Sequence, residues 1–124
     1  MKKSNSTYSV LVLAVAFMLL GSFGMQAQVL YQPQPAANPN LGGNTPWTAV
    51  CASNNFNEYF VSFNWDPPMV ESDNEFILEL SDADGYFASP TELTRVSDKN
   101  AVFDFEFQFE LPSDIRGDNF KMRV

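Results

Sequence analysis

The chain has 124 residues, enough for one domain, and its 7 basic and 15 acidic residues give a net charge of −8. A surface this acidic repels nucleic acid phosphates and anionic lipids, so we expect neither as a partner. One cysteine excludes an internal disulfide, and the absence of histidine removes the commonest general base and metal ligand.

The N-terminus, residues 1–27, has the pattern of a secretory signal peptide. Lys2 and Lys3 precede the apolar run 10–20 (VLVLAVAFMLL), and small and polar residues follow it. The run is shorter than the roughly 20 apolar residues of a transmembrane helix, which disfavours the alternative of a retained membrane anchor. We expect cleavage after Ala27. Gln28 then begins an exported chain, free of the membrane, whose 5 basic and 15 acidic residues give −10.

The next segment, residues 28–46 (QVLYQPQPAANPNLGGNTP), is rich in Pro, Asn, Gln and Gly and has no periodic apolar residues. This composition predicts a flexible linker. We expect regular structure to begin near Trp47 and a single domain to span residues 47–124.

Within that domain, apolar and polar residues alternate in the runs 59–65, 76–80, 103–111 and 120–124. The clearest run is FDFEFQFEL, in which four phenylalanines and Leu111 share one parity and acidic or amide residues take the other. Because side chains of a strand point alternately to opposite faces, these runs predict half-buried strands.

Turn-forming residues separate these runs at 66–68, 82–85, 89–90, 97–100 and 112–119. Short strands between such turns predict an all-β fold, an antiparallel Ig-like or fibronectin type III-like β-sandwich. Val124 is an inward-facing position in mid-strand. We therefore expect a truncated domain without its last strand, in a fragment of a longer protein, with an unpaired edge at the strand that ends there.

The block 61–68 (VSFNWDPP) resembles an early strand of a fibronectin type III domain, which ends in a tryptophan followed by prolines. The run 76–80 would be the next core strand, and 111–124 resembles the corner that leads into the penultimate strand. A tyrosine usually forms a hydrogen bond in that corner. Here Phe120 takes the ring position without a hydroxyl, which departs from the standard domain.

The stretches 74–81, 87–93 and 111–124 resemble the N-terminal region of flavobacterial surface proteins that carry a gliding-motility-associated C-terminal domain. The resemblance spans residues 47–124. It implies export by the type IX secretion system, a cell-surface or secreted role, and further domains of the same longer chain as partners. It supplies no catalytic residues.

The loop Asp82-Ala-Asp-Gly85 resembles the start of a calcium-binding loop. An EF-hand needs a bidentate Glu at its twelfth position, which Leu93 occupies here. A looser calcium site that uses Asp73, Glu75, Asp82 or Asp84 is the alternative to a plain turn, which we favour. We predict no metal and no cofactor.

Three carboxylates, Asp104, Glu106 and Glu110, share the solvent face of one predicted strand, but nothing in the sequence builds a cleft around them. The chain also has no phosphate-binding loop and no nucleophile elbow. We therefore predict that it is not an enzyme and has no catalytic residues.

Five aromatic residues could stack on sugar rings: Trp47, Tyr59, Trp65, Tyr86 and Phe87. Trp65 has core parity, whereas Tyr86 and Phe87 lie beside a turn and are the better candidates for ligand contact. Ordinary packing is the interpretation we favour for the set. Cys51 is either a free buried thiol or half of a bridge to sequence outside this chain.

These observations predict a structural spacer or adhesion module of a larger gliding-motility-associated, type IX-secreted protein. Surface glycans or proteins are candidate partners. The main alternative is a carbohydrate-binding module, and the third is a non-catalytic part of a secreted hydrolase.

Overall fold

A computed structural model describes residues 28–124, so the expected signal peptide lies outside the described residues. This part of the chain contains β1 (Gln34–Ala36), a 3-10 turn η1 (Pro39–Leu41), β2 (Tyr59–Asn64), β3 (Phe76–Leu80), β4 (Thr91–Val96), β5 (Asp104–Phe109) and β6 (Met122–Arg123). None of the helical structure between residues 28 and 124 has the length and hydropathy needed to cross a bilayer.

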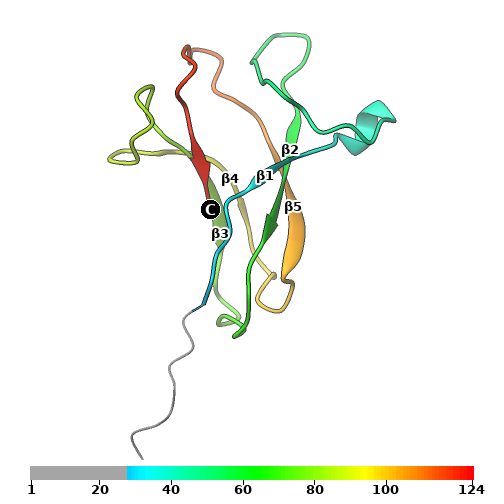
Figure 1. Cartoon of the computed structure of the whole chain (residues 1–124), viewed down its shortest axis with the longest axis vertical. Coiled ribbons are helices and arrows are strands. Elements are labelled where there is room, and N and C mark those ends of the chain that lie inside the picture. The colour runs from blue at the N-terminus through cyan, green and yellow to red at the C-terminus, as the bar shows by residue number, and fades with distance from the viewer. Residues whose placement is uncertain (1–27) are drawn as a thin grey trace, which may run out of the picture.

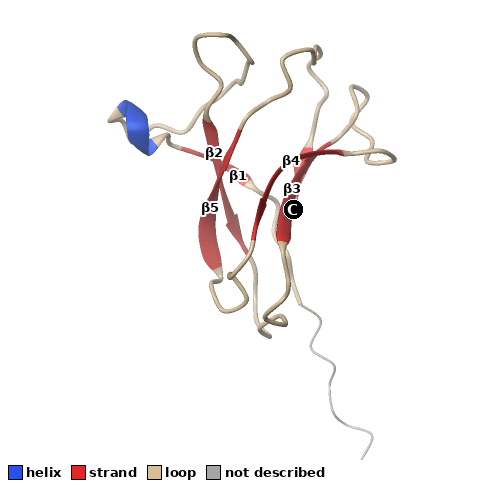
Figure 2. Ribbon diagram, turned by 180° about the vertical axis from the view of Figure 1, so that it is seen from behind, coloured by secondary structure: helices blue, strands red, loops and turns tan. Residues whose placement is uncertain are grey.

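The strands form two antiparallel sheets of three strands each, ordered β1-β2-β5 and β4-β3-β6. Figures 1 and 2 show the two sheets as facing layers with the loops gathered at both ends. The prediction of an all-β sandwich is therefore confirmed.

Two of the alternating runs become β2 and β5, which are neighbours in the first sheet. In the register of β2 with β5, Val61 lies opposite Phe107 and Phe63 opposite Phe105. Both strands bury their odd-numbered side chains and expose or half-expose the even ones. This confirms the prediction of one dry and one wet face, because neighbouring side chains of matched parity project from the sheet together.

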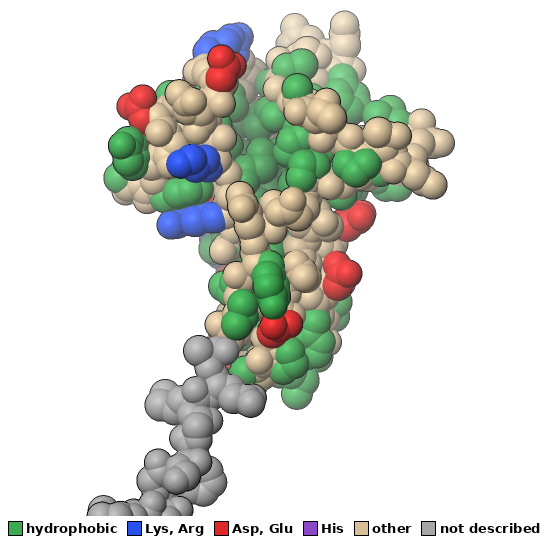
Figure 3. Space-filling model, viewed as in Figure 1, with side chains coloured by type: hydrophobic (Ala, Val, Ile, Leu, Met, Phe, Trp, Pro, Cys, Tyr) green, Lys and Arg blue, Asp and Glu red, His purple; other side chains and the backbone are tan. Residues whose placement is uncertain are grey.

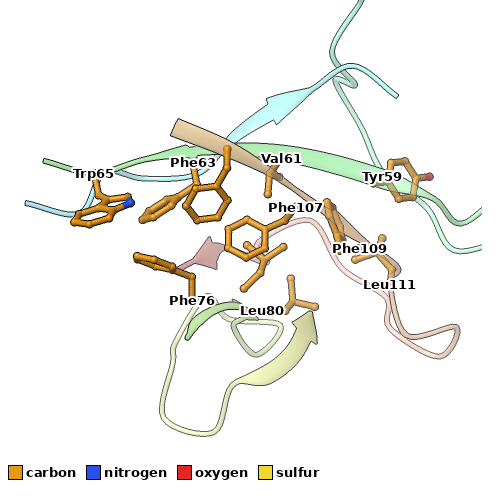
Figure 4. Packing of buried hydrophobic residues seen from close by; sticks show 11 residues of the cluster. Tyr59, Val61, Phe63, Trp65, Phe76, Leu80, Phe107, Phe109 and Leu111 are labelled. Carbon is orange, nitrogen blue, oxygen red and sulfur yellow. The ribbon is translucent and has the colours of Figure 1, made fainter. Parts of the chain in front are cut away.

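The core lies between these strands and β3, whose Phe76, Leu78 and Leu80 are buried. Figure 4 shows Phe76 and Leu80 pointing across the interlayer space toward the side chains of β2 and β5. The ring of Phe76 lies 5.6 Å from that of Phe63 and 5.3 Å from that of Phe105, centroid to centroid. Such pairs contribute about 0.5–1.5 kcal/mol beyond their burial, so they stabilise the contact between the layers.

Trp65 closes one end of this core, as its parity predicts. Its side chain is 1% exposed, and its indole Nε1–H donates to the carbonyl of Val102 at 2.8 Å. Its backbone forms an isolated bridge with Leu30. The bridge ties the N-terminal segment to the first sheet.

The N-terminal segment differs from the expectation that regular structure begins near Trp47. β1 pairs with β2, with Pro35 opposite Val61, and the Asn38 amide donates to the carbonyl of Glu58 at 3.1 Å. Strand pairing needs backbone groups rather than apolar side chains. For this reason a segment rich in Pro and Gln, with only Ala36 buried among the strand residues, still joins the sheet.

β4 is the second strand that alternation does not indicate. It forms one edge of the second sheet and has no buried residue. Arg95 on this strand pairs with Glu92 at 2.8 Å and with Glu75. The hydrogen bond from Arg95 holds the pKa of the Glu92 carboxyl below its ordinary value. Because no side chain of β4 is buried, packing does not require apolar and polar residues to alternate along it. Charged and polar side chains are therefore accommodated on this strand.

β6 forms the opposite edge of the second sheet, beside β3. Ser81, directly after β3, is buried and fixes this strand with two bonds. Its N–H donates to the carbonyl of Lys121 at 2.9 Å, and its Oγ accepts from the N–H of Lys121 at 2.8 Å.

Candidate functional site

A groove of about 760 Å³ lies between β1 in one sheet and β6 in the other. Its apolar floor includes Val61, Leu80 and Leu111, which belong to the sandwich core. Figure 3 shows hydrophobic side chains lining a hollow between two arms of the molecule. The groove thus lies over one side of the sandwich core, whose residues stay buried beneath it. We call it the edge groove.

The walls of the edge groove are half-buried apolar side chains from separate loops. Trp47 and Val50 come from the segment before β2, Ile115 and Phe120 from the loop before β6, and Met122 from β6 itself. Trp47 is held in place because its Nε1–H donates to the carbonyl of Phe60 at 2.6 Å. Sequence parity correctly placed Phe120 and Met122 toward the core.

On the side of β6 away from β3, the backbone groups have no hydrogen-bond partner among residues 28–124. The N–H and C=O of Lys121 point toward Ser81 and therefore toward β3. Because successive residues of a strand direct these groups to opposite sides, those of Met122 and Val124 point away from β3. No described strand pairs with β6 on that side.

Two of the three charged residues that line the edge groove, Arg116 and Lys121, are basic, and the third is Asp118. Residues 28–124 hold five basic side chains, and three of them, Arg116, Lys121 and Arg123, lie within eight positions. Figure 3 shows basic side chains on one side of the hollow. Arg123 pairs with Glu79 at 2.8 Å and covers the ring of Phe87 at 4.4 Å.

Cys51 also lines the edge groove and is exposed, so the buried-thiol alternative for this residue is wrong. The Tyr59 hydroxyl fixes the local backbone: it accepts from the N–H of Cys51 at 2.9 Å and donates to its C=O at 2.8 Å. The buried Tyr59 therefore holds the part of the groove wall around Cys51 in place through these two hydrogen bonds.

The two candidate ligand-contact aromatics lie on the loop between β3 and β4 and differ in accessibility. Tyr86 is 68% exposed, whereas Phe87 is half-buried beneath the guanidinium of Arg123. The Tyr86 backbone N–H donates to the Asp82 carboxylate at 2.8 Å. Only one ring of the pair therefore offers a largely open face.

The candidate calcium ligands do not converge. The Asp82 carboxylate accepts from the N–H of Asp84 at 3.1 Å as well as from that of Tyr86, and Glu75 pairs with Arg95. Between residues 28 and 124 no group of three or more carboxylate or cysteine side chains is arranged to hold a metal ion. The Asp82 carboxylate instead closes its own turn, for which Gly85 provides a φ of +85°.

The carboxylates of the β5 run face solvent, as their parity predicts. Asp104, Glu106 and Glu110 are exposed, on the side of the sheet away from the core. They lie outside the edge groove, whose one carboxylate among the described lining residues is Asp118. The strand therefore does not place an acid–base pair in this hollow.

No family model, curated protein or solved structure matches this chain. A function for this chain must therefore be inferred from the strand order and from the residues of the groove. The sequence did not indicate the edge groove. Trp47, Val50 and Ile115 in its walls come from loops with no periodic pattern.

Proposed function

We propose that residues 28–124 form a non-catalytic Ig-like or fibronectin type III-like module that serves as a structural spacer or adhesion domain of a larger exported surface protein. The order of the strands carries this proposal. In Ig-type sandwiches strands A, B and E form one sheet, and strand C lies between C′ and F in the other. The orders β1-β2-β5 and β4-β3-β6 correspond to A-B-E and C′-C-F.

The position of Trp65 favours the fibronectin type III variant within this class. It stands directly after β2, the counterpart of strand B, and is buried against the ring of Phe76 at 5.5 Å. The sequence resemblance places its tryptophan at the same point, before the prolines 67 and 68.

Two features support a binding or spacer role over catalysis. The carboxylates of β5 are spread along an exposed face, and the edge groove is lined mainly by apolar side chains. Acid–base catalysis needs opposed groups that reach one reacting atom. An apolar groove beside a free strand edge is instead a recognition surface.

Export to the cell surface is supported by the signal-peptide pattern and the acidic composition. Fractionation of the native cells should place the protein outside the cytoplasm, and N-terminal sequencing should begin at Gln28. Surface proteolysis of intact cells should remove it. A cytoplasmic protein that retains Met1 would contradict the proposal.

Sequencing the native transcript tests whether these residues belong to a gliding-associated, type IX-secreted chain. A coding sequence that continues beyond codon 124 into a gliding-associated or sorting module would support the spacer role. A catalytic domain encoded there would favour the hydrolase alternative instead.

A carbohydrate-binding module is the second candidate, because the exposed Tyr86 ring stands at a loop tip. Glycan-array binding that is lost in Tyr86→Ala or Phe87→Ala would favour it. Phe56→Ala is a suitable control, since this ring is 38% exposed and packs against Tyr59 in another part of the molecule. Binding that survives in both loop variants would count against a sugar platform.

A further inference from the structure

The start of the expected mature chain lies against the sandwich. The carbonyl of Val29 accepts from the N–H of Asp66 at 2.9 Å, and the N–H of Tyr31 donates to the carbonyl of Asn64 at 3.1 Å. Gln28 therefore stands directly before backbone that is already paired with the first sheet.

The side-chain amide of Gln28 is buried without compensation. The residue is half-buried in a hollow of about 300 Å³ that Val70, Phe76 and Val124 also line. Its Nε2 has no hydrogen-bond partner, and it is the one buried side-chain nitrogen or oxygen in that state among residues 28–124. An amide that leaves water without gaining an acceptor destabilises the folded chain.

The carboxylates that line the same hollow already have partners. Glu75 pairs with Arg95. Glu79 pairs with Arg123 at 2.8 Å. A new α-ammonium group at Gln28 would therefore enter a hollow in which each lining carboxylate is already neutralised by an arginine, beside apolar side chains that disfavour an unpaired charge.

We propose that Gln28 is a modification site: once residues 1–27 are removed, its α-amino group and its side-chain amide close to an N-terminal pyroglutamate, which docks in this hollow. This inference rests on the proposed export, with cleavage after Ala27. In the reaction the α-nitrogen forms a bond to Cδ, and the bond from Cδ to Nε2 breaks. Nε2 leaves as ammonia, with its two hydrogens and one from the amine. Nothing is oxidised or reduced, and no co-reactant is consumed.

The reaction removes both unfavourable groups from the hollow. The departing atom is the unpartnered Nε2, and the ammonium charge is replaced by a neutral lactam N–H. Because the two reacting groups belong to one residue, the attack is intramolecular and is favoured by proximity. An α-amino group titrates close to neutral pH, so a part of it is the neutral nucleophile that the attack needs.

The first test is mass spectrometry, with fragmentation, of the intact protein exported by the native cells. We expect the chain to begin at position 28 and to be lighter than the unmodified chain by one ammonia. Gln28→Asn is the matched control, because it keeps an amide but could close only a smaller, strained ring. This variant should begin at the same position with its full mass.

The second test measures whether the modified terminus is docked. Pyroglutamyl aminopeptidase should release the terminal residue from the folded protein at least about tenfold more slowly than from a peptide of residues 28–34 with the same modified start. The reason is that the protein must first open locally at the bonds of Val29 and Tyr31.

Four results would overturn the proposal. A chain that begins at position 28 with an unmodified glutamine would do so and would leave the proposed export standing, whereas a chain that retains Met1 would contradict both. Any other first residue would also overturn it, because Gln28 would not be terminal. Loss of ammonia in Gln28→Asn would assign the loss to another amide. Equal release from protein and peptide would show that the terminus is not docked.

Discussion

Replacement of Phe107 by alanine tests the two-faced strand on which the sandwich depends. Its side chain is fully buried, and its ring lies 5.1 Å from that of Phe105 and 6.2 Å from that of Phe63. A buried Phe→Ala change costs about 3–5 kcal/mol, because transfer free energy is lost and a cavity remains. This is a large part of the roughly 5–15 kcal/mol that stabilises a typical domain.

Urea denaturation followed by tryptophan fluorescence measures this cost, since Trp65 is buried and reports on core exposure. With a slope of about 1.5 kcal/mol per M, the loss of about 3–5 kcal/mol lowers the midpoint by about 2–3 M. Gln108→Ala is the matched control, because this neighbour points to the exposed face of the same strand. It should shift the free energy of unfolding by no more than about 0.5 kcal/mol.

Similar losses in the two variants would refute the assignment of a dry and a wet face to β5. So would a midpoint unchanged in Phe107→Ala, because the residue would then not be in the core of the folded protein.

Three further predictions concern single contacts. Asn57→Asp replaces an amide that donates to the Leu111 carbonyl at 2.8 Å by a carboxylate that this carbonyl repels. The free energy of unfolding, measured by urea denaturation, should fall by about 1–3 kcal/mol. Little change would show that the contact is absent in solution. Gly85→Ala places a Cβ 3.0 Å from a backbone oxygen of the loop before β6, at a residue whose φ is +85°. Thermal unfolding should show a free energy of unfolding lower by more than about 1 kcal/mol. A stabilised variant would contradict this geometry. Arg95→Ala should raise the pKa of Glu92 toward its ordinary value in an NMR titration, because the lowering bond is lost. In the unmodified protein this carboxyl stabilises the fold above its unfolded pKa, and its contribution is lost as the pH falls through its lower folded pKa. A Glu92 titration that is the same in Arg95→Ala would show that the pair is not formed.

The elements foreseen from alternation are those that bury one face. The runs 59–65, 76–80 and 103–111 supply β2, β3 and β5, and their buried residues are of the predicted parity. β1 and β4 carry no such signal, because β1 buries only Ala36 and β4 buries no residue. Where few side chains of a strand are buried, packing imposes no alternation on its sequence.

The sequence predicted only part of the candidate site. The exposure of Tyr86 beside its turn and the burial of Trp65 followed from position and parity. The cover that Arg123 places over Phe87 did not, since it depends on a contact between residues 36 positions apart. The exposure of Cys51 likewise depends on how the loop before β2 settles against the Tyr59 hydroxyl.

The sequence by itself determined which side chains leave water, because a strand has a period of two and each run fixes its own inner face. Tertiary structure alone decided which strands are neighbours, and hence that β1 and β6 flank an open groove at the edge of the sandwich. Neighbour relations arise from contacts between residues far apart in the chain, and local alternation carries no record of them.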